Sequence, residues 1–133
     1  LANTFNNLGD VEYRRGNPAQ AREWYQKALA IATHIDKRYV MISALQSLGT
    51  ISIQLGEFEQ AANYRMAYVP LIAELQDQVA ADCDILLQAQ LLHAQGDPTR
   101  ALELIQPFLN NPQTDPWLKH EAQSLNQQIA LYA

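Results

Sequence analysis

The fold of this chain is decided by the stretch Leu8-Gly9-Asp10-Val11-Glu12-Tyr13-Arg14-Arg15-Gly16-Asn17-Pro18-Ala19-Gln20-Ala21. Residues of this stretch and of its surroundings return along the chain at an interval of 40 residues. The interval joins Phe5 to Leu45 and Ile85, Gly16 to Gly56 and Gly96, Ala21 to Ala61 and Ala101, and Leu29 to Val69 and Leu109. A fixed period of this size indicates a solenoid, in which each repeat buries an apolar face against its neighbours.

Each repeat has the pattern of two antiparallel helices joined by a tight turn. In the first repeat Phe5 and Leu8 keep helical spacing, and Gly16 is predicted to end their helix because glycine tolerates positive φ. Pro18 suits the first turn of the following helix, and Asn17 is expected to be its cap. The repeat is therefore predicted to be a helical hairpin.

The same pattern predicts the boundaries of the remaining elements. The predicted repeats cover residues 2–36, 38–76 and 78–111, and a closing helix covers 115–132. The closing helix has one apolar stripe, formed by Leu118, Ala122, Leu125, Ile129 and Tyr132. Small residues at Gly9, Gly49 and Ala89 are expected to let a paired helix approach closely. Pro70 is expected to kink or split the second helix of its repeat.

Composition limits the class of protein. The chain has 133 residues with 48% apolar content, no apolar run long enough to span a membrane and no secretory signal pattern. Cys83 is its single cysteine, which fits a reducing compartment, and we expect a cytoplasmic location. The net charge is −5 and the nine Lys and Arg residues are scattered, so this domain is not expected to bind nucleic acid. Because the periodic pattern is already under way near Leu1, we expect 1–133 to be a single domain cut from a longer protein.

The first repeat resembles a tetratricopeptide repeat. The resemblance lies in Phe5-x2-Leu8-Gly9, in Gly16, and in Ala21-x3-Tyr25-x2-Ala28-Leu29. It implies an all-α, right-handed superhelical solenoid of three helical hairpins followed by a C-terminal helix. The interval of 40 residues is similar to the long repeats of kinesin light chain and of the sensor regions of bacterial transcriptional activators and signalling ATPases.

The chain also departs from the family pattern. Glu12 stands where the family prefers a large apolar residue, and Gln88-Ala89 replaces Leu-Gly in the third repeat. Arg65 and Tyr68 replace an aromatic and a small residue in the second repeat. We expect these differences to alter packing details more than the fold.

The resemblance implies a protein-binding or peptide-binding module whose first helices line a concave groove. The groove residues predicted in this way are Asn3, Asn6, Asp10, Tyr13, Gln46, Thr50, Gln54, Leu86, Gln90 and His93. Asn and Gln offer a donor and an acceptor together, so they can bind the main chain of an extended peptide, and Leu86 is expected to take an apolar anchor. The alternative is that these residues only solvate an exposed helix face. The positive clamp that some relatives use on acidic C-terminal tails is missing.

No catalytic motif appears in the sequence. It has no glycine-rich phosphate loop, no nucleophile elbow and no His-Glu-x-x-His pair, and His34, His93 and His120 lie in different repeats. We therefore expect no enzymatic activity, cofactor or metal. A protein-interaction or peptide-interaction module, with a scaffold or signalling role, is the leading hypothesis, and a ligand-sensing or peptide-sensing domain of a larger regulator or a subdomain of a larger enzyme are alternatives. The exposed apolar ends of such a solenoid are also expected to allow a homodimer.

Overall fold

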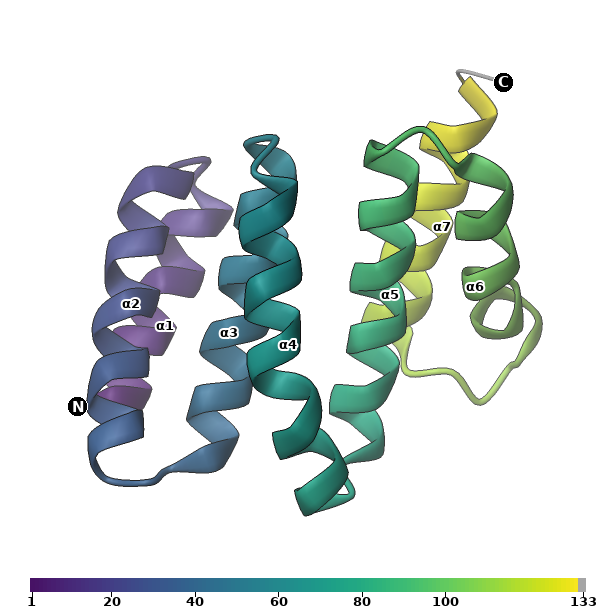
Figure 1. The fold of residues 1–133 in the computed structure, drawn as a ribbon. Helices are drawn as coiled ribbons and strands as arrows, with labels where there is room; N and C mark the ends of the chain where they lie inside the picture. The colour runs from purple at the N-terminus through teal and green to yellow at the C-terminus, as the bar shows by residue number, and fades with distance from the viewer. Residues whose placement is uncertain (132–133) are drawn as a thin grey trace. The chain divides into compact units, whose positions relative to one another are not determined.

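The computed structural model describes residues 1–131, so Tyr132 of the predicted stripe lies outside it. These residues form seven α-helices and no strand (Figure 1). The helices are α1 (Ala2–Arg14), α2 (Pro18–His34), α3 (Arg38–Gln54), α4 (Phe58–Leu75), α5 (Gln78–Ala94), α6 (Pro98–Asn110) and α7 (Pro116–Leu131). The predicted all-α helical repeat is confirmed.

The helices fall into two compact units. Unit 1 runs from Leu1 to Ala80 and contains α1 to α4, and unit 2 begins at Ala81 and contains most of α5 together with α6 and α7. In unit 1, α1 packs on α2, α2 on α3 and α3 on α4 (Figure 1). Pro70 lies inside α4, which continues as one α-helix to Leu75. The predicted split of this helix therefore does not occur.

The turn inside each hairpin has the same construction in all three repeats. Gly16, Gly56 and Gly96 have φ values of 82°, 77° and 91°. In the first turn the N–H of Asn17 donates to the carbonyl of Glu12 at 2.9 Å, and the residues 40 and 80 positions later repeat this bond at 2.8 and 2.9 Å. This arrangement satisfies a carbonyl that the helix end leaves open. The glycines therefore end the first helices as predicted.

The alanines that repeat every 40 residues mark the tightest helix contacts. Ala21, Ala61 and Ala101 are each 0% exposed. In unit 1, Ala21 belongs to a buried cluster with Tyr25 and Ile51, which also contains Leu48. In unit 2 the core joins all three helices, through Leu86 and Ala89 of α5, Ala101, Ile105 and Phe108 of α6, and Leu118, Ala122, Leu125 and Ile129 of α7. Each unit therefore has an apolar core of its own.

Gly9 permits a close approach between the first two helices. A Cβ atom at this position would lie 2.6 Å from the Tyr25 ring, closer than side-chain carbons pack. The prediction that a small residue is required here is confirmed. The Tyr25 hydroxyl thereby reaches Asp10 of α1.

The turns between repeats contain residues other than glycine in the left-handed conformation. Asp36 and Gln76 have positive φ values of 56° and 52° and lie 40 residues apart. The N–H of Lys37 donates to the carbonyl of Ala32 at 2.8 Å, which is the bond seen after the glycines. The chain therefore adopts the same helix ending without glycine, at some cost in backbone strain.

Asn17 occupies the N-cap position of α2 but does not cap the helix with its side chain. Its Nδ2 atom donates instead to Oε2 of Glu12 at 2.8 Å. The equivalent Asp97 does cap α6, because its carboxylate accepts the N–H of Arg100 at 3.2 Å. The predicted position of the cap was right, and the predicted capping bond of Asn17 was wrong.

Candidate functional site

The candidate site is a row of polar side chains on α1 and α3, which we call the polar face. Its residues are Asn6, Asp10 and Tyr13 of α1 and Ser43, Gln46, Ser47, Thr50 and Gln54 of α3. Those of α1 follow one another at spacings of four and three residues, so they share one side of the helix. The whole polar face belongs to unit 1.

At one end of the polar face, Asn6 bonds across the two helices. Its Nδ2 atom donates to Oγ of Ser43 at 3.2 Å. Its Oδ1 atom is buried and has no hydrogen-bond partner among the described residues. A buried acceptor without a partner is costly, so this amide has bonding capacity that the folded domain does not use.

In the middle of the polar face, Asp10 is held by a buried tyrosine of α2. The Tyr25 hydroxyl donates to Oδ1 of Asp10 at 2.5 Å, although the Tyr25 residue is only 2% exposed. Burial and the hydrogen bond to Asp10 raise the pKa of the Tyr25 hydroxyl above its usual value, while a hydrogen bond from Ser47 lowers this pKa. The hydroxyl therefore remains a donor and keeps the carboxylate in place.

At the other end, the two helices are joined by Tyr13 and Gln54. Nε2 of Gln54 donates to the Tyr13 hydroxyl at 2.5 Å. Between the ends, Nε2 of Gln46 donates to the carbonyl of Ala80 at 2.9 Å, and the Thr50 hydroxyl donates to the carbonyl of Gln46 at 3.1 Å. Three predicted groove amides, Asn6, Gln46 and Gln54, therefore take part in internal hydrogen bonds.

The remaining predicted residues lie apart from this network. Asn3 is exposed on the first turn of α1. Gln90 and His93 lie on α5 in unit 2, and Nδ1 of His93 is buried without a partner among the described residues. Leu86 is only 4% exposed and packs in the core of unit 2, so it is a core residue and not a surface anchor.

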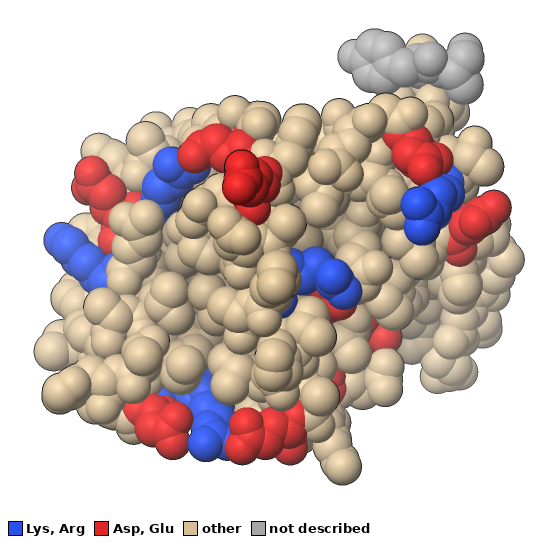
Figure 2. Space-filling view, viewed as in Figure 1, with Lys and Arg blue, Asp and Glu red and all other residues tan. Residues whose placement is uncertain are grey.

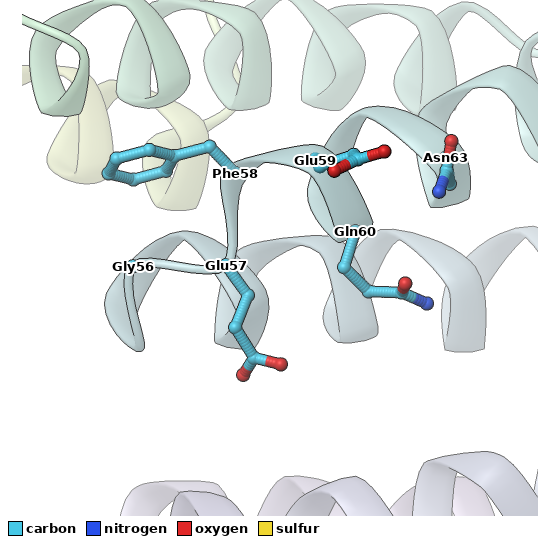
Figure 3. A pocket seen from close by; sticks show the side chains of 6 residues that line it. All are labelled: Gly56, Glu57, Phe58, Glu59, Gln60 and Asn63. Carbon is cyan, nitrogen blue, oxygen red and sulfur yellow. The ribbon is translucent and has the colours of Figure 1, made fainter.

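A shallow hollow lies elsewhere in unit 1, at the start of α4 (Figure 3). It has a volume of about 500 Å³ and is lined by Gly56, Glu57, Phe58, Glu59, Gln60 and Asn63. All of its lining comes from one short segment, and Oε2 of Glu57 accepts a hydrogen bond from Arg22 at 2.5 Å. The hollow is open and mostly polar, whereas small-molecule sites are typically enclosed and mostly apolar.

The distribution of charged and apolar side chains also gives information on the classes of partner. Figure 2 shows acidic and basic side chains interspersed on the face that it draws, without a continuous basic surface. Among residues 1–131 there is no helix with the length and apolar character to cross a membrane. Across those same residues, His, Cys, Asp and Glu side chains do not gather in threes where they could hold a metal ion.

Apolar side chains are exposed on α1. Leu8 is 36% exposed and Val11 is 41% exposed, and the two lie one turn apart. They provide the apolar end expected from the sequence. Formation of a homodimer through them stays a prediction.

Comparison with known families identifies the repeat. Models of the tetratricopeptide repeat match residues 1–65, within unit 1, and residues 86–107, within unit 2. Comparison of the chain with curated proteins and with solved structures gave no match. Tetratricopeptide repeats are non-catalytic units that generally mediate protein–protein interactions. Together the two matches take in more than half of the chain, which therefore belongs to the tetratricopeptide repeat family.

Proposed function

We propose that the polar face binds an extended or helical segment of a partner protein, as a non-covalent interaction module. The observation that supports this proposal is the interhelical network of Asn6 with Ser43 and of Tyr13 with Gln54. Side chains held in one arrangement before binding lose less conformational entropy when a partner arrives. A face that only solvated the helices would have no need of such order.

The polar face also suits a protein segment better than the alternatives. Nucleic acid is not part of the proposal, because only nine Lys and Arg residues occur in a chain of net charge −5. Amide and hydroxyl groups can bond to a main chain whatever its side chains are. We include exposed Asn3 of α1 in this surface, and we assign Gln90 and His93 to a corresponding surface of unit 2.

Site-specific photocrosslinking tests the proposal. A benzophenone amino acid is placed at Asn3 or at Gln54, which are exposed on α1 and α3, or at Gln26, which is exposed on α2 as a matched control. The three proteins are irradiated in lysate of the source cells, and the crosslinked proteins are identified by mass spectrometry. We expect the same partner from Asn3 and Gln54 and not from Gln26.

The outcomes of the crosslinking experiment distinguish the functional hypotheses for this domain. A partner that crosslinks only through Gln26 would contradict the polar face as the binding surface. Absence of a protein partner from all three positions would contradict an interaction module that acts on other chains. Crosslinks to another segment of a longer polypeptide containing this domain would favour the regulatory alternative.

A further inference from the structure

We infer that the partner segment places a Lys or Arg side chain against Asp10, so that the polar face selects basic segments. The inference rests on the proposed function, because it names the chemistry of the partner at the same surface. It follows from the surroundings of Asp10, a half-buried carboxylate of the polar face that accepts a hydrogen bond from Tyr25.

Four other carboxylates of unit 1 are paired with basic residues. Glu12 lies 3.5 Å from Arg15 and Glu57 lies 2.5 Å from Arg22. Arg38 pairs with both Asp36 and Glu74. Asp10 is half-buried, and among residues 1–131 no basic side chain lies within ion-pair distance of it. A carboxylate withdrawn from water without a cation is unfavourable, and a partner's cation would remove that cost.

The geometry of Asp10 leaves one oxygen for a ligand. Oδ1 accepts the Tyr25 hydroxyl, whereas Oδ2 has no partner among residues 1–131 and is not among the atoms buried from solvent. A Lys ammonium or an Arg guanidinium supplies N–H donors and a positive charge together. Because Tyr25 fixes the carboxylate, the cation meets an acceptor that is already oriented.

The neighbouring groups favour a donor over an acceptor in the ligand. The nitrogen atoms of Asn6 and Gln46 already donate to Ser43 and to the carbonyl of Ala80. Arg14 lies one turn beyond Asp10 and is exposed, so it is the group through which an acidic segment would bind if the inference were wrong.

Peptide pools of defined central residue test the inference. Each immobilised pool contains nine-residue peptides with blocked ends, randomised at all positions except the centre, which is Lys, Arg, Nε-acetyl-lysine, Leu or Glu. Labelled wild-type protein is compared with Asp10→Asn, which still accepts the Tyr25 hydroxyl, and with Glu23→Gln, an equal change of charge at an exposed position of α2. Thermal melting establishes that both variants are folded.

We expect the Lys and Arg pools to retain wild-type protein about fivefold more than the acetyl-lysine pool, as for a charge-assisted hydrogen bond. Asp10→Asn should abolish this preference and leave binding to the Leu pool unchanged, whereas Glu23→Gln should keep the preference. If the wild-type protein binds the pools without preferring Lys or Arg, or if the preference survives in Asp10→Asn, the inference is overturned while the proposed function stands. A preference for the Glu pool would overturn it in favour of Arg14. If the wild-type protein binds none of the pools, this result would overturn the proposed function together with the inference.

Discussion

Tyr25 links the packing of the domain to its candidate site at the scale of a single residue. Its ring fills the space that Gly9 leaves open, and its hydroxyl bonds to Asp10 on the polar face. The same side chain belongs to the buried cluster between α2 and α3. The position of Asp10 therefore depends on the core of unit 1.

The pKa of Tyr25 leads to a prediction about alkaline pH. The raised pKa means that the unfolded chain ionises this hydroxyl at about pH 10 while the folded chain keeps it protonated. Its contribution to stability is therefore complete below about pH 10 and is lost as the pH rises further. Tyr25→Phe should lower stability by about 1 kcal/mol at neutral pH and should make the alkaline loss shallower.

Urea denaturation of both proteins between about pH 8 and about pH 11 measures this difference. The two proteins differ only at residue 25, so contributions from the rest of the chain cancel in the comparison. If the unfolding free energies of the two proteins fall in parallel as the pH rises, the Tyr25 hydroxyl is not the cause of the pH dependence.

At the scale of the helices, equivalent helix ends differ between repeats. Asp97 caps α6 with its side chain, whereas Asn17 at the same position before α2 bonds to Glu12. Asp97→Ala should therefore destabilise unit 2 by about 1 kcal/mol. Asn17→Ala should cost less than about 0.5 kcal/mol, because it removes an exposed bond between side chains.

The two tryptophans allow each unit to be followed separately. Trp24 lies on α2 of unit 1 and Trp117 lies on α7 of unit 2. Urea unfolding would be followed by fluorescence of Trp117 for the Asp97 variant and of Trp24 for the Asn17 variant, with the other tryptophan replaced by Phe. Equal losses for the two alanine variants would contradict the difference in capping.

Most of the elements were predictable from the sequence because they follow from local signals. Gly16 and Pro18 mark a helix end and a helix start whatever surrounds them, and the structure agrees at both. The predicted repeats end at Asp36 and Gln76, but the positive φ of these two residues was not predicted, because residues other than glycine rarely adopt it. Asn17 was misjudged because Glu12, five residues away, competes for its side chain.

The candidate site was predictable only in outline. Helical spacing placed Asn6, Asp10 and Tyr13 on one side of α1. It did not show which groups bond to one another, because pairs such as Asn6 and Ser43 depend on the rotation of both helices about their axes. Leu86 was misjudged for the same reason, since a small rotation separates a core position from a surface position.

For the whole molecule, two separate cores predict a separable response to core mutations. Ile105 lies in the core of unit 2 and Ile51 in that of unit 1, and both are 0% exposed. Ile105→Ala should cost about 2–5 kcal/mol and should shift the Trp117 transition more than the Trp24 transition. Ile51→Ala is the matched control and should do the reverse. Equal shifts of both tryptophan signals by either variant would show that the chain unfolds as one cooperative body.

The bonds of the polar face have a consequence for how such a domain changes during evolution. The Asn6–Ser43 and Tyr13–Gln54 bonds join residues 37 and 41 positions apart, so each crosses from one repeat to the next. Duplication or loss of a 40-residue unit would keep every hairpin turn but would give these side chains new neighbours. Under the proposed function, recombination between repeats would therefore alter the binding preference of the polar face without any point mutation. For the same reason, a grafted recognition surface must carry both repeats of each bonded pair.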